Sequence, residues 1–256
     1  MDVDGQTWPT ALVPAAMAWF GNAAKMRIIG RIVADGMPKT VFDYGAGGGS
    51  GWAETLRLHP EITLAAYEPD PSSARRLRQS VPTAQVYDGE AGGVRVDADI
   101  AVSFSVFEHV ADRSSYLHHA MRCLKPGGTF FLNYDDGHFR HPGSQIAALR
   151  NRFAAILPQI GLTRYYQATV LKDDADRLIA EVGFVTIDER YENLEGMKNL
   201  SKTIDSAAKA DFAEMWLALE NRLNAEFRRT TSEVFQGDRT NLWREMASRT
   251  LELRKS

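Results

Sequence analysis

The segment Val41-Phe42-Asp43-Tyr44-Gly45-Ala46-Gly47-Gly48-Gly49-Ser50-Gly51 decides the fold class of this chain. Its first residues are apolar, as in a buried strand, and they are followed by the acid Asp43. Five glycines then occupy seven positions, from 45 to 51. Because glycine lacks a Cβ atom and tolerates positive φ, this turn suits a ligand that touches the backbone. Residues 52–58 have the pattern of a helix, so the segment predicts the strand, turn and helix of a nucleotide-binding α/β unit.

The composition is that of an ordinary soluble globular protein, with 256 residues of which 44% are hydrophobic and 25% are charged. A formal net charge of −3 argues against a dedicated nucleic-acid binder, which usually carries a basic surplus. The single cysteine, Cys123, excludes an intramolecular disulfide and a multi-cysteine zinc site. No apolar run reaches the ~18 residues of a membrane span, and the acidic N-terminus lacks the basic region of a signal peptide. We therefore expect a cytoplasmic protein that binds neither nucleic acid nor membrane.

Expected strands and helices alternate along most of the chain. Apolar residues at helical spacing predict a helix over about residues 10–34, and further helices are expected at 52–58, 113–124 and 173–182. Expected strands cover 40–44, 63–67, 84–87, 99–104, 129–133 and 184–190, with another at 197–204. Two more helices are expected at 205–227 and 241–253. This alternation predicts an α/β fold with a doubly wound, mostly parallel sheet of seven strands and helices on both faces.

The regions outside the alternation set the expected domain organisation. Residues 1–38 are expected to form an N-terminal helical cap, residues 39–204 the ligand-binding domain, and residues 205–256 a C-terminal helical extension. An insertion at 137–171 follows the fifth strand. The N-terminal helix either packs on the core or covers the ligand pocket as a lid, and both roles stay open.

Three kinds of ligand use a glycine-rich turn after a strand. A phosphate-binding loop requires a lysine, which is absent here. The dinucleotide pattern G-x-G-x-x-G does not fit either, because its last glycine position is occupied by Ser50 if the pattern begins at Gly45 and by Trp52 if it begins at Gly47. The pattern that fits is acid-x-G-x-G-x-G, from Asp43 to Gly49. It resembles motif I of the class I S-adenosyl-L-methionine (SAM)-dependent methyltransferases.

Four further segments are similar to motifs of that family. Glu68 stands 25 residues after Asp43 (68 − 43), at the end of the second strand, where a carboxylate holds ribose hydroxyls. Residues 89–91 resemble the loop that faces adenine, residues 99–110 resemble motif IV with its Glu-His-Val tail, and residues 124–128 match the turn before strand 5. The resemblance covers about residues 39–133. It implies a Rossmann-like methyltransferase fold and SAM as the cofactor.

The resemblance also implies which residues bind SAM. Asp43 would meet the amino group of the methionine part, or else only cap the turn, and Phe104 would line that part. Glu90 would face adenine, with Asp88 as a competitor. The predicted cofactor-binding residues are Asp43, Gly45, Ala46, Gly47, Glu68, Pro69, Glu90 and Phe104.

Methyl transfer to oxygen usually requires a base. The predicted catalytic residues are His109, His138 and His141, with the pair Asp135 and Asp136 as further candidates. Each histidine has a simpler interpretation, as a structural residue at a helix start or as an exposed loop residue. No metal is expected, because the oxygen-bearing residues near Asp135 match no metal-binding spacing.

We interpret the chain as a SAM-dependent methyltransferase whose partner is a small-molecule acceptor, methylated at oxygen rather than at nitrogen or carbon. Acceptor specificity is expected to lie in residues 137–166. The alternatives are a methyltransferase for a macromolecule and a SAM-binding module without catalysis. The sequence leaves open the acceptor and whether the chain forms a homodimer.

Overall fold

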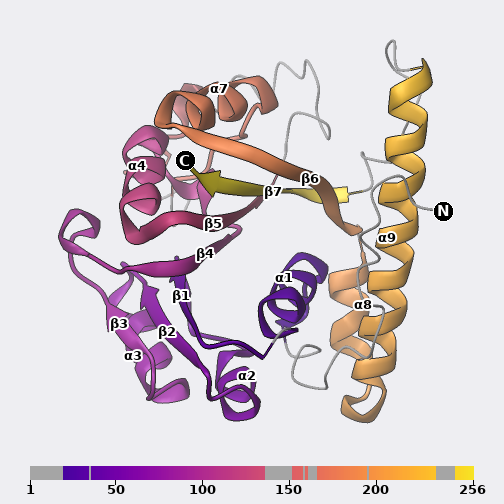
Figure 1. Ribbon diagram of the computed structural model, residues 1–256, viewed down its shortest axis with the longest axis horizontal. Helices are drawn as coiled ribbons and strands as arrows, with labels where there is room; N and C mark the ends of the chain where they lie inside the picture. Colours follow the sequence, from indigo (N-terminus) through magenta and orange to yellow (C-terminus); the bar gives the residue numbers. More distant parts are fainter. Residues whose placement is uncertain are drawn as a thin grey trace.

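The computed structural model describes residues 20–34, 36–135, 152–157, 159–160, 166–194, 196–234 and 246–256, of which 227–234 and 247 are described only in their backbone. One seven-stranded sheet forms the centre of the molecule, in the order β3-β2-β1-β4-β5-β7-β6 (Figure 1). The strands are β1 (Lys39–Tyr44), β2 (Ile62–Tyr67), β3 (Gln85–Tyr87), β4 (Ala98–Phe104), β5 (Leu124–Asp135), β6 (Phe184–Leu194) and β7 (Met246–Lys255). Strands β1 to β5 are parallel, and β7 is antiparallel to both β5 and β6. The predicted α/β fold with a mostly parallel sheet of seven strands is confirmed.

The helices cover both faces of this sheet. They are α1 (Ala23–Val33), α2 (Trp52–Leu58), α3 (Pro71–Ser80), α4 (Arg113–Cys123), α7 (Lys172–Val182), α8 (Met197–Thr203) and α9 (Lys209–Val234), with short 3₁₀ turns η2 (Ala91–Gly93), η3 (Phe107–His109) and η4 (Ser206–Ala208). Residues of α1, α2, α3 and α9 share one apolar cluster with one face of the sheet. Residues of α4 and α7 pack in a second cluster on the other face (Figure 1).

Helix α1 shows why the local sequence forms these elements. The side chain of Asn22 accepts a hydrogen bond of 3.1 Å from the Lys25 N–H and so caps the first turn. Met26, Ile29 and Ile32 recur at helical spacing and are almost completely buried. The helix therefore packs its apolar stripe on the sheet, and it also lies against α9 and β6.

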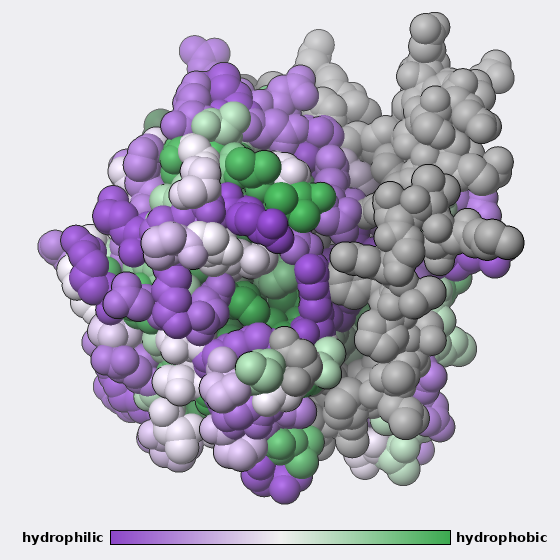
Figure 2. Space-filling model, viewed as in Figure 1, coloured by the Kyte–Doolittle hydropathy of each residue, from purple (hydrophilic) through white to green (hydrophobic). Residues whose placement is uncertain are grey.

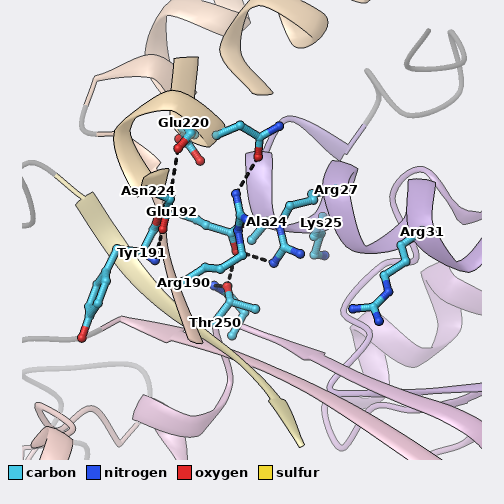
Figure 3. A network of polar contacts seen from close by, with 12 residues as sticks. Ala24, Lys25, Arg27, Arg31, Arg190, Tyr191, Glu192, Glu220, Asn224 and Thr250 are labelled. Carbon is cyan, nitrogen blue, oxygen red and sulfur yellow. Dashed lines mark hydrogen bonds and ion pairs between the residues drawn. The ribbon is translucent and has the colours of Figure 1, made fainter. Parts of the chain in front are cut away.

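A polar network joins α1 to β6, β7 and α9 on this same face (Figure 3). Arg27 of α1 forms a bidentate ion pair with Glu192 of β6, and both side chains are at least nine-tenths buried. Thr250 of β7 also donates to Glu192. The Glu220 carboxylate of α9 accepts hydrogen bonds from the backbone N–H groups of residues 193 and 194. The network fixes α1 and α9 against the edge of the sheet that β6 and β7 form.

Two predicted elements are wrong. The strand expected at 197–204 is helix α8, and the part of the expected helix 241–253 that the structure describes, residues 246–253, belongs to strand β7. The physical reason lies in the two-residue period of β7: Leu251 and Leu253 pack with α4 and α7, while Thr250 and Glu252 bond with Glu192 and Arg31 on the opposite face. The range 205–256 is therefore not a purely helical extension, because its last strand lies inside the sheet between β5 and β6.

Within the described residues, no helix is both long and apolar enough to cross a membrane.

Candidate active site

The order of the strands marks the carboxyl ends of β1 and β4 as the place where a ligand crevice is expected. From β1 the chain runs outward to β2 and β3, whereas β4 lies on the other side of β1 and leads to β5. Open α/β sheets bind their ligands where the strand order reverses in this way. The glycine-rich loop follows β1, and residues 105–110, the second half of the motif IV segment, follow β4. The two most informative sequence motifs therefore meet at one edge of the sheet.

The glycine-rich loop needs its glycines for two different reasons. Gly45 and Gly49 have φ values of 89° and 73°, and a Cβ atom on either would lie 2.4 Å from a carbon of Val106 or Leu77. Gly47 also has a positive φ, 59°, but a Cβ atom built there has no neighbour within 4 Å. The packing of the protein itself requires glycine at 45 and 49. At position 47 glycine is required only by the backbone conformation. Because no atom of the protein occupies the space beside Gly47, a ligand can approach the loop on this side.

Glu68 contacts this loop directly. One carboxylate oxygen accepts a hydrogen bond of 2.8 Å from the Gly47 N–H, and the other accepts one of 2.9 Å from the Asp70 N–H. The side chain is largely buried, with 8% exposure. Each carboxylate oxygen can accept a second hydrogen bond, so Glu68 can also hold a hydroxyl group. The loop after β1 and the acid after β2 therefore form one site.

Asp43 lies below the loop and is 1% exposed. The indole N–H of Trp52 donates to Asp43 Oδ2 at 2.7 Å. Burial raises the pKa of the Asp43 carboxyl, and the nearby charge of Lys25 counteracts this effect. Asp43 therefore anchors Trp52, the first residue of α2, beside the glycine loop.

Lys25 was not identified from the sequence. It extends from α1, and its Nζ atom lies 5.0 Å from the ring centre of Phe104 and 6.0 Å from that of Phe20. Burial lowers the pKa of Lys25, Asp43 counteracts this, and the positive charge of Lys198 lowers it further. The sequence contains one sign of a special role for Lys25, its position as a charged residue within a largely apolar helix segment. The site therefore contains a partly buried cation beside the aromatic ring at the end of β4.

His109 follows β4, in η3. Its Nδ1 atom lies 3.0 Å from the backbone carbonyl oxygen of Tyr166. A carbonyl can only accept, so Nδ1 carries the hydrogen in this contact, and in the neutral ring the lone pair is on Nε2. The side chain is exposed. The contact brings the predicted base beside Tyr166, which belongs to the predicted insertion at 137–171.

Glu108 was also missed, although it belongs to the Glu-His-Val tail. It is 6% exposed, and its Oε2 atom is buried with no hydrogen-bond partner among the described residues. Burial raises the pKa of Glu108 to about 7, and the negative charge of Asp135 at the end of β5 acts in the same direction. A carboxyl group whose pKa lies near neutral pH thus lies between the ends of β4 and β5.

The other predicted residues divide into three groups. Phe104 is 6% exposed at the end of β4, and Ala46 is 6% exposed and its N–H donates to the Tyr67 carbonyl at 3.1 Å. Pro69 follows Glu68, and Glu90 is exposed in the loop after β3. His138, His141 and Asp136 lie outside the described residues. The residues that the structure does describe include no cluster of three His, Cys, Asp or Glu side chains that could hold a metal.

A family model described as "Methyltransferase domain" matches residues 20–188 of this chain. Solved structures of three methyl-transferring or related enzymes resemble the chain in fold, each covering 90% of it. The SAM-dependent methyltransferase of Mesorhizobium loti has a TM-score of 0.55 at 13% identity, with 97% of that chain covered. The magnesium protoporphyrin IX methyltransferase of Synechocystis, solved with bound S-adenosylhomocysteine (SAH), has a TM-score of 0.52 at 13% identity and 80% coverage. The cyclopropane synthase MmaA2 of Mycobacterium tuberculosis has a TM-score of 0.55 at 14% identity and 84% coverage. No curated protein matches the sequence.

Proposed function

The chain belongs to the SAM-dependent methyltransferases, since the methyltransferase domain spans residues 20–188, and from this premise we propose that it methylates a small molecule at oxygen. Family membership fixes the cofactor but not the acceptor, because one fold can carry different reactions. The observation that carries the proposal is the exposed imidazole of His109 at the carboxyl end of β4, held through Nδ1 by the Tyr166 carbonyl.

The residues of the crevice fit the parts of SAM. The open side of Gly47 admits the cofactor to the backbone, and Glu68 beside it would hold the ribose hydroxyls. Asp43 would attract the amino group of the methionine part, and Lys25 its carboxylate. Phe104 supplies an aromatic wall beside them. Opposite charges in the protein thus face opposite charges in the methionine part.

SAM supplies an activated methyl group, which the acceptor takes in an in-line displacement that depends mainly on positioning. The acceptor oxygen must lose its proton as the new O–C bond forms. Nε2 of neutral His109 would take that proton, while the Tyr166 carbonyl keeps the ring oriented. The Trp52 and Phe20 rings, which pack edge to face beside the glycine loop, exclude water from that side.

His138 and His141 stay predicted bases of the same reaction, and residues 137–171 stay the predicted source of acceptor specificity. They compete with His109 for the role of base. A single assay on His109 separates these assignments.

The test combines an acceptor screen with a His109→Gln variant. SAM carrying a deuterated methyl group is mixed with pooled alcohols, phenols, carboxylic acids, amines and active-carbon compounds, and the products are identified by mass spectrometry. On the acceptor found, His109→Gln should lower turnover by ~10²–10⁴-fold and leave the Kd for SAM unchanged. Full turnover in His109→Gln would assign the base to another residue. Methylation of only nitrogen or carbon, or of only a nucleic acid or protein, would refute the proposed acceptor.

A further inference from the structure

A chain of hydrogen bonds crosses the sheet near the carboxyl ends of β4, β5 and β6. Ser105, the residue after Phe104, donates its N–H to the Asn133 carbonyl of β5 at 2.9 Å. The Asn133 carboxamide donates to the Ser248 hydroxyl of β7 at 2.9 Å. Asn193 of β6 donates to the same hydroxyl oxygen at 2.6 Å. The chain of bonds therefore links the end of β4 with Asn193, near the end of β6.

Asn193 completes the link to α1. Its Oδ1 atom accepts a hydrogen bond of 3.3 Å from the Ala24 N–H, in the first turn of that helix. An N–H group can only donate, so this contact also fixes the orientation of the carboxamide, with Nδ2 toward Ser248. The backbone of Asn193 has a φ of 63°, and its N–H donates to Glu220 of α9 at 3.1 Å. Residues other than glycine rarely adopt this conformation, and they keep it where the surrounding structure requires it. Contacts with β7, α1 and α9 therefore hold Asn193 in place.

The contact with Ala24 bears directly on Lys25, the next residue. The first N–H groups of a helix have no partner within the helix. Asn193 accepts from the Ala24 N–H, and Asn22 accepts from that of Lys25 at 3.1 Å. From this turn Lys25 extends to a position where its Nζ atom lies 5.0 Å from the centre of the Phe104 ring. The same chain of bonds thus holds the residue after Phe104 and the residue before Lys25.

Helix α1 also lies beside space that a ligand can enter. Figure 2 shows a hollow with an apolar floor near the middle of the viewed face, close to where Figure 1 draws α1. The positive charge of Lys25 counteracts the rise that burial causes in the pKa of Asp43, at the end of β1. The placement of the first turn of α1 therefore decides where the Lys25 ammonium lies relative to the carboxyl ends of β1 and β4.

We propose that Asn193 is a positioning residue for SAM: it holds the first turn of α1 so that the Lys25 ammonium meets the carboxylate of the methionine part. Asn193 acts through Ala24 and Lys25 and does not itself touch the cofactor. This inference rests on the proposed function, which pairs Lys25 with the SAM carboxylate. A purely structural Asn193 would affect every ligand of the site alike, whereas a positioning residue affects only ligands that carry the carboxylate.

The experiment compares SAH with 5′-methylthioadenosine, which has the same adenine, ribose and sulfur but no amino-acid part. Calorimetry on the full chain gives the Kd of each compound. Lys25→Met removes the ammonium and should raise the Kd of SAH by ~10-fold or more, the usual loss for a hydrogen bond to a charged group. Asn193→Gly removes the carboxamide and tolerates the positive φ. It should raise the Kd of SAH by about fivefold, a part of that loss, and leave the Kd of 5′-methylthioadenosine unchanged.

Asn224→Ala is the matched control. Asn224 of α9 is 4% exposed, and its carboxamide accepts from the Tyr191 N–H and donates to the Tyr191 carbonyl. The substitution removes buried hydrogen bonds between α9 and β6 and leaves the contact of Asn193 with α1 intact. It should lower the melting temperature and leave the ratio of the two Kd values as in the wild type.

A double variant that combines Asn193→Gly with Lys25→Met tests whether Asn193 acts through Lys25. If it does, the double variant binds SAH no more weakly than Lys25→Met alone. Losses that multiply would overturn the inference, as would an unchanged SAH affinity in Asn193→Gly or an equal loss for both compounds. In each of these cases a weaker binding of SAH by Lys25→Met leaves the proposed function standing. An unchanged SAH affinity in Lys25→Met would instead remove Lys25 from the cofactor site, and would overturn that part of the proposed function together with the inference.

Discussion

Substitution of Gly47 by alanine separates the role of the glycine loop in folding from its role in binding SAM. Gly47 has a φ of 59°, and a Cβ atom there meets nothing within 4 Å. In the free protein the substitution therefore costs only the left-handed backbone conformation, ~1–2 kcal/mol. With ~2–4 °C per kcal/mol for a chain of this size, the melting temperature should fall by ~2–8 °C.

The loss of SAM affinity in Gly47→Ala should be much larger than the small loss of stability would suggest. If the cofactor contacts the loop at Gly47, the new methyl group occupies the space of the cofactor and the Gly47 N–H loses its alignment with Glu68. We expect the Kd for SAM to rise at least tenfold, which corresponds to 1.4 kcal/mol or more. Differential scanning fluorimetry gives the stability and calorimetry gives the Kd.

Gly127 provides the matched control. It has a φ of 73°, and its Cβ position is equally open, but it lies near the amino end of β5, at the opposite edge of the sheet. Gly127→Ala should lower the melting temperature by a similar amount and leave the Kd for SAM unchanged. Equal SAM affinity in wild type and Gly47→Ala would refute the reasoning, because it would mean that the cofactor does not approach the loop there.

Three further predictions concern buried charges. Glu68→Ala should weaken SAM binding by ~1–3 kcal/mol in calorimetry, because it removes a buried acceptor and releases the Gly47 N–H; an unchanged Kd would exclude Glu68 from the ribose site. Burial raises the pKa of Glu108 in the folded chain to about 7, against 4.5 for an ordinary glutamate. Between these two pH values the folded chain binds more protons than the unfolded chain, so the free energy of unfolding falls as pH rises. The total loss from Glu108 is at most roughly 3 kcal/mol. Glu108→Gln should reduce this slope in urea titrations at pH 4.5 to 8, while Glu220, whose pKa burial also raises to about 7, keeps part of it; an identical slope in both proteins would contradict the assignment. Glu192→Gln should destabilise the fold by ~3–5 kcal/mol, because it removes the carboxylate that forms the ion pair with the buried guanidinium of Arg27. Arg57→Gln breaks the exposed pair with Glu54 and should leave the free energy of unfolding almost unchanged, so a similar loss in both variants would contradict the argument.

The part of the site that follows strands β1 and β2 could be predicted from the sequence. The glycine loop and Glu68 follow adjacent parallel strands, and the carboxyl ends of such strands meet at one edge of a sheet. Their contact, from the Gly47 N–H to the Glu68 carboxylate, is a direct consequence of that register. The identity of the family followed from the same few residues.

Residues that reach the site through tertiary packing could not be predicted. Lys25 lies 18 residues before Asp43 in the chain (43 − 25), and only the packing of α1 on the sheet brings its charge into the crevice. Glu108 stands beside the predicted His109, but its burial and the proximity of Asp135 depend on the pairing of β4 with β5. Neither effect has a local sequence pattern.

The last strand was misassigned for a similar reason. In β7 the polar residues Thr250 and Glu252 face Glu192 of β6 and Arg31 of α1, so both of its faces are covered. Its pairing partner β5 ends more than a hundred residues earlier in the chain, at Asp135.

A crystal structure of the chain with SAH tests the central claim most directly. We predict density for one SAH molecule at the carboxyl ends of β1 and β4, with its ribose hydroxyls within hydrogen-bond distance of Glu68 and its amino-acid part between Asp43, Lys25 and Phe104. Density for SAH at any other place on the molecule, or a ribose away from Glu68, would contradict the account.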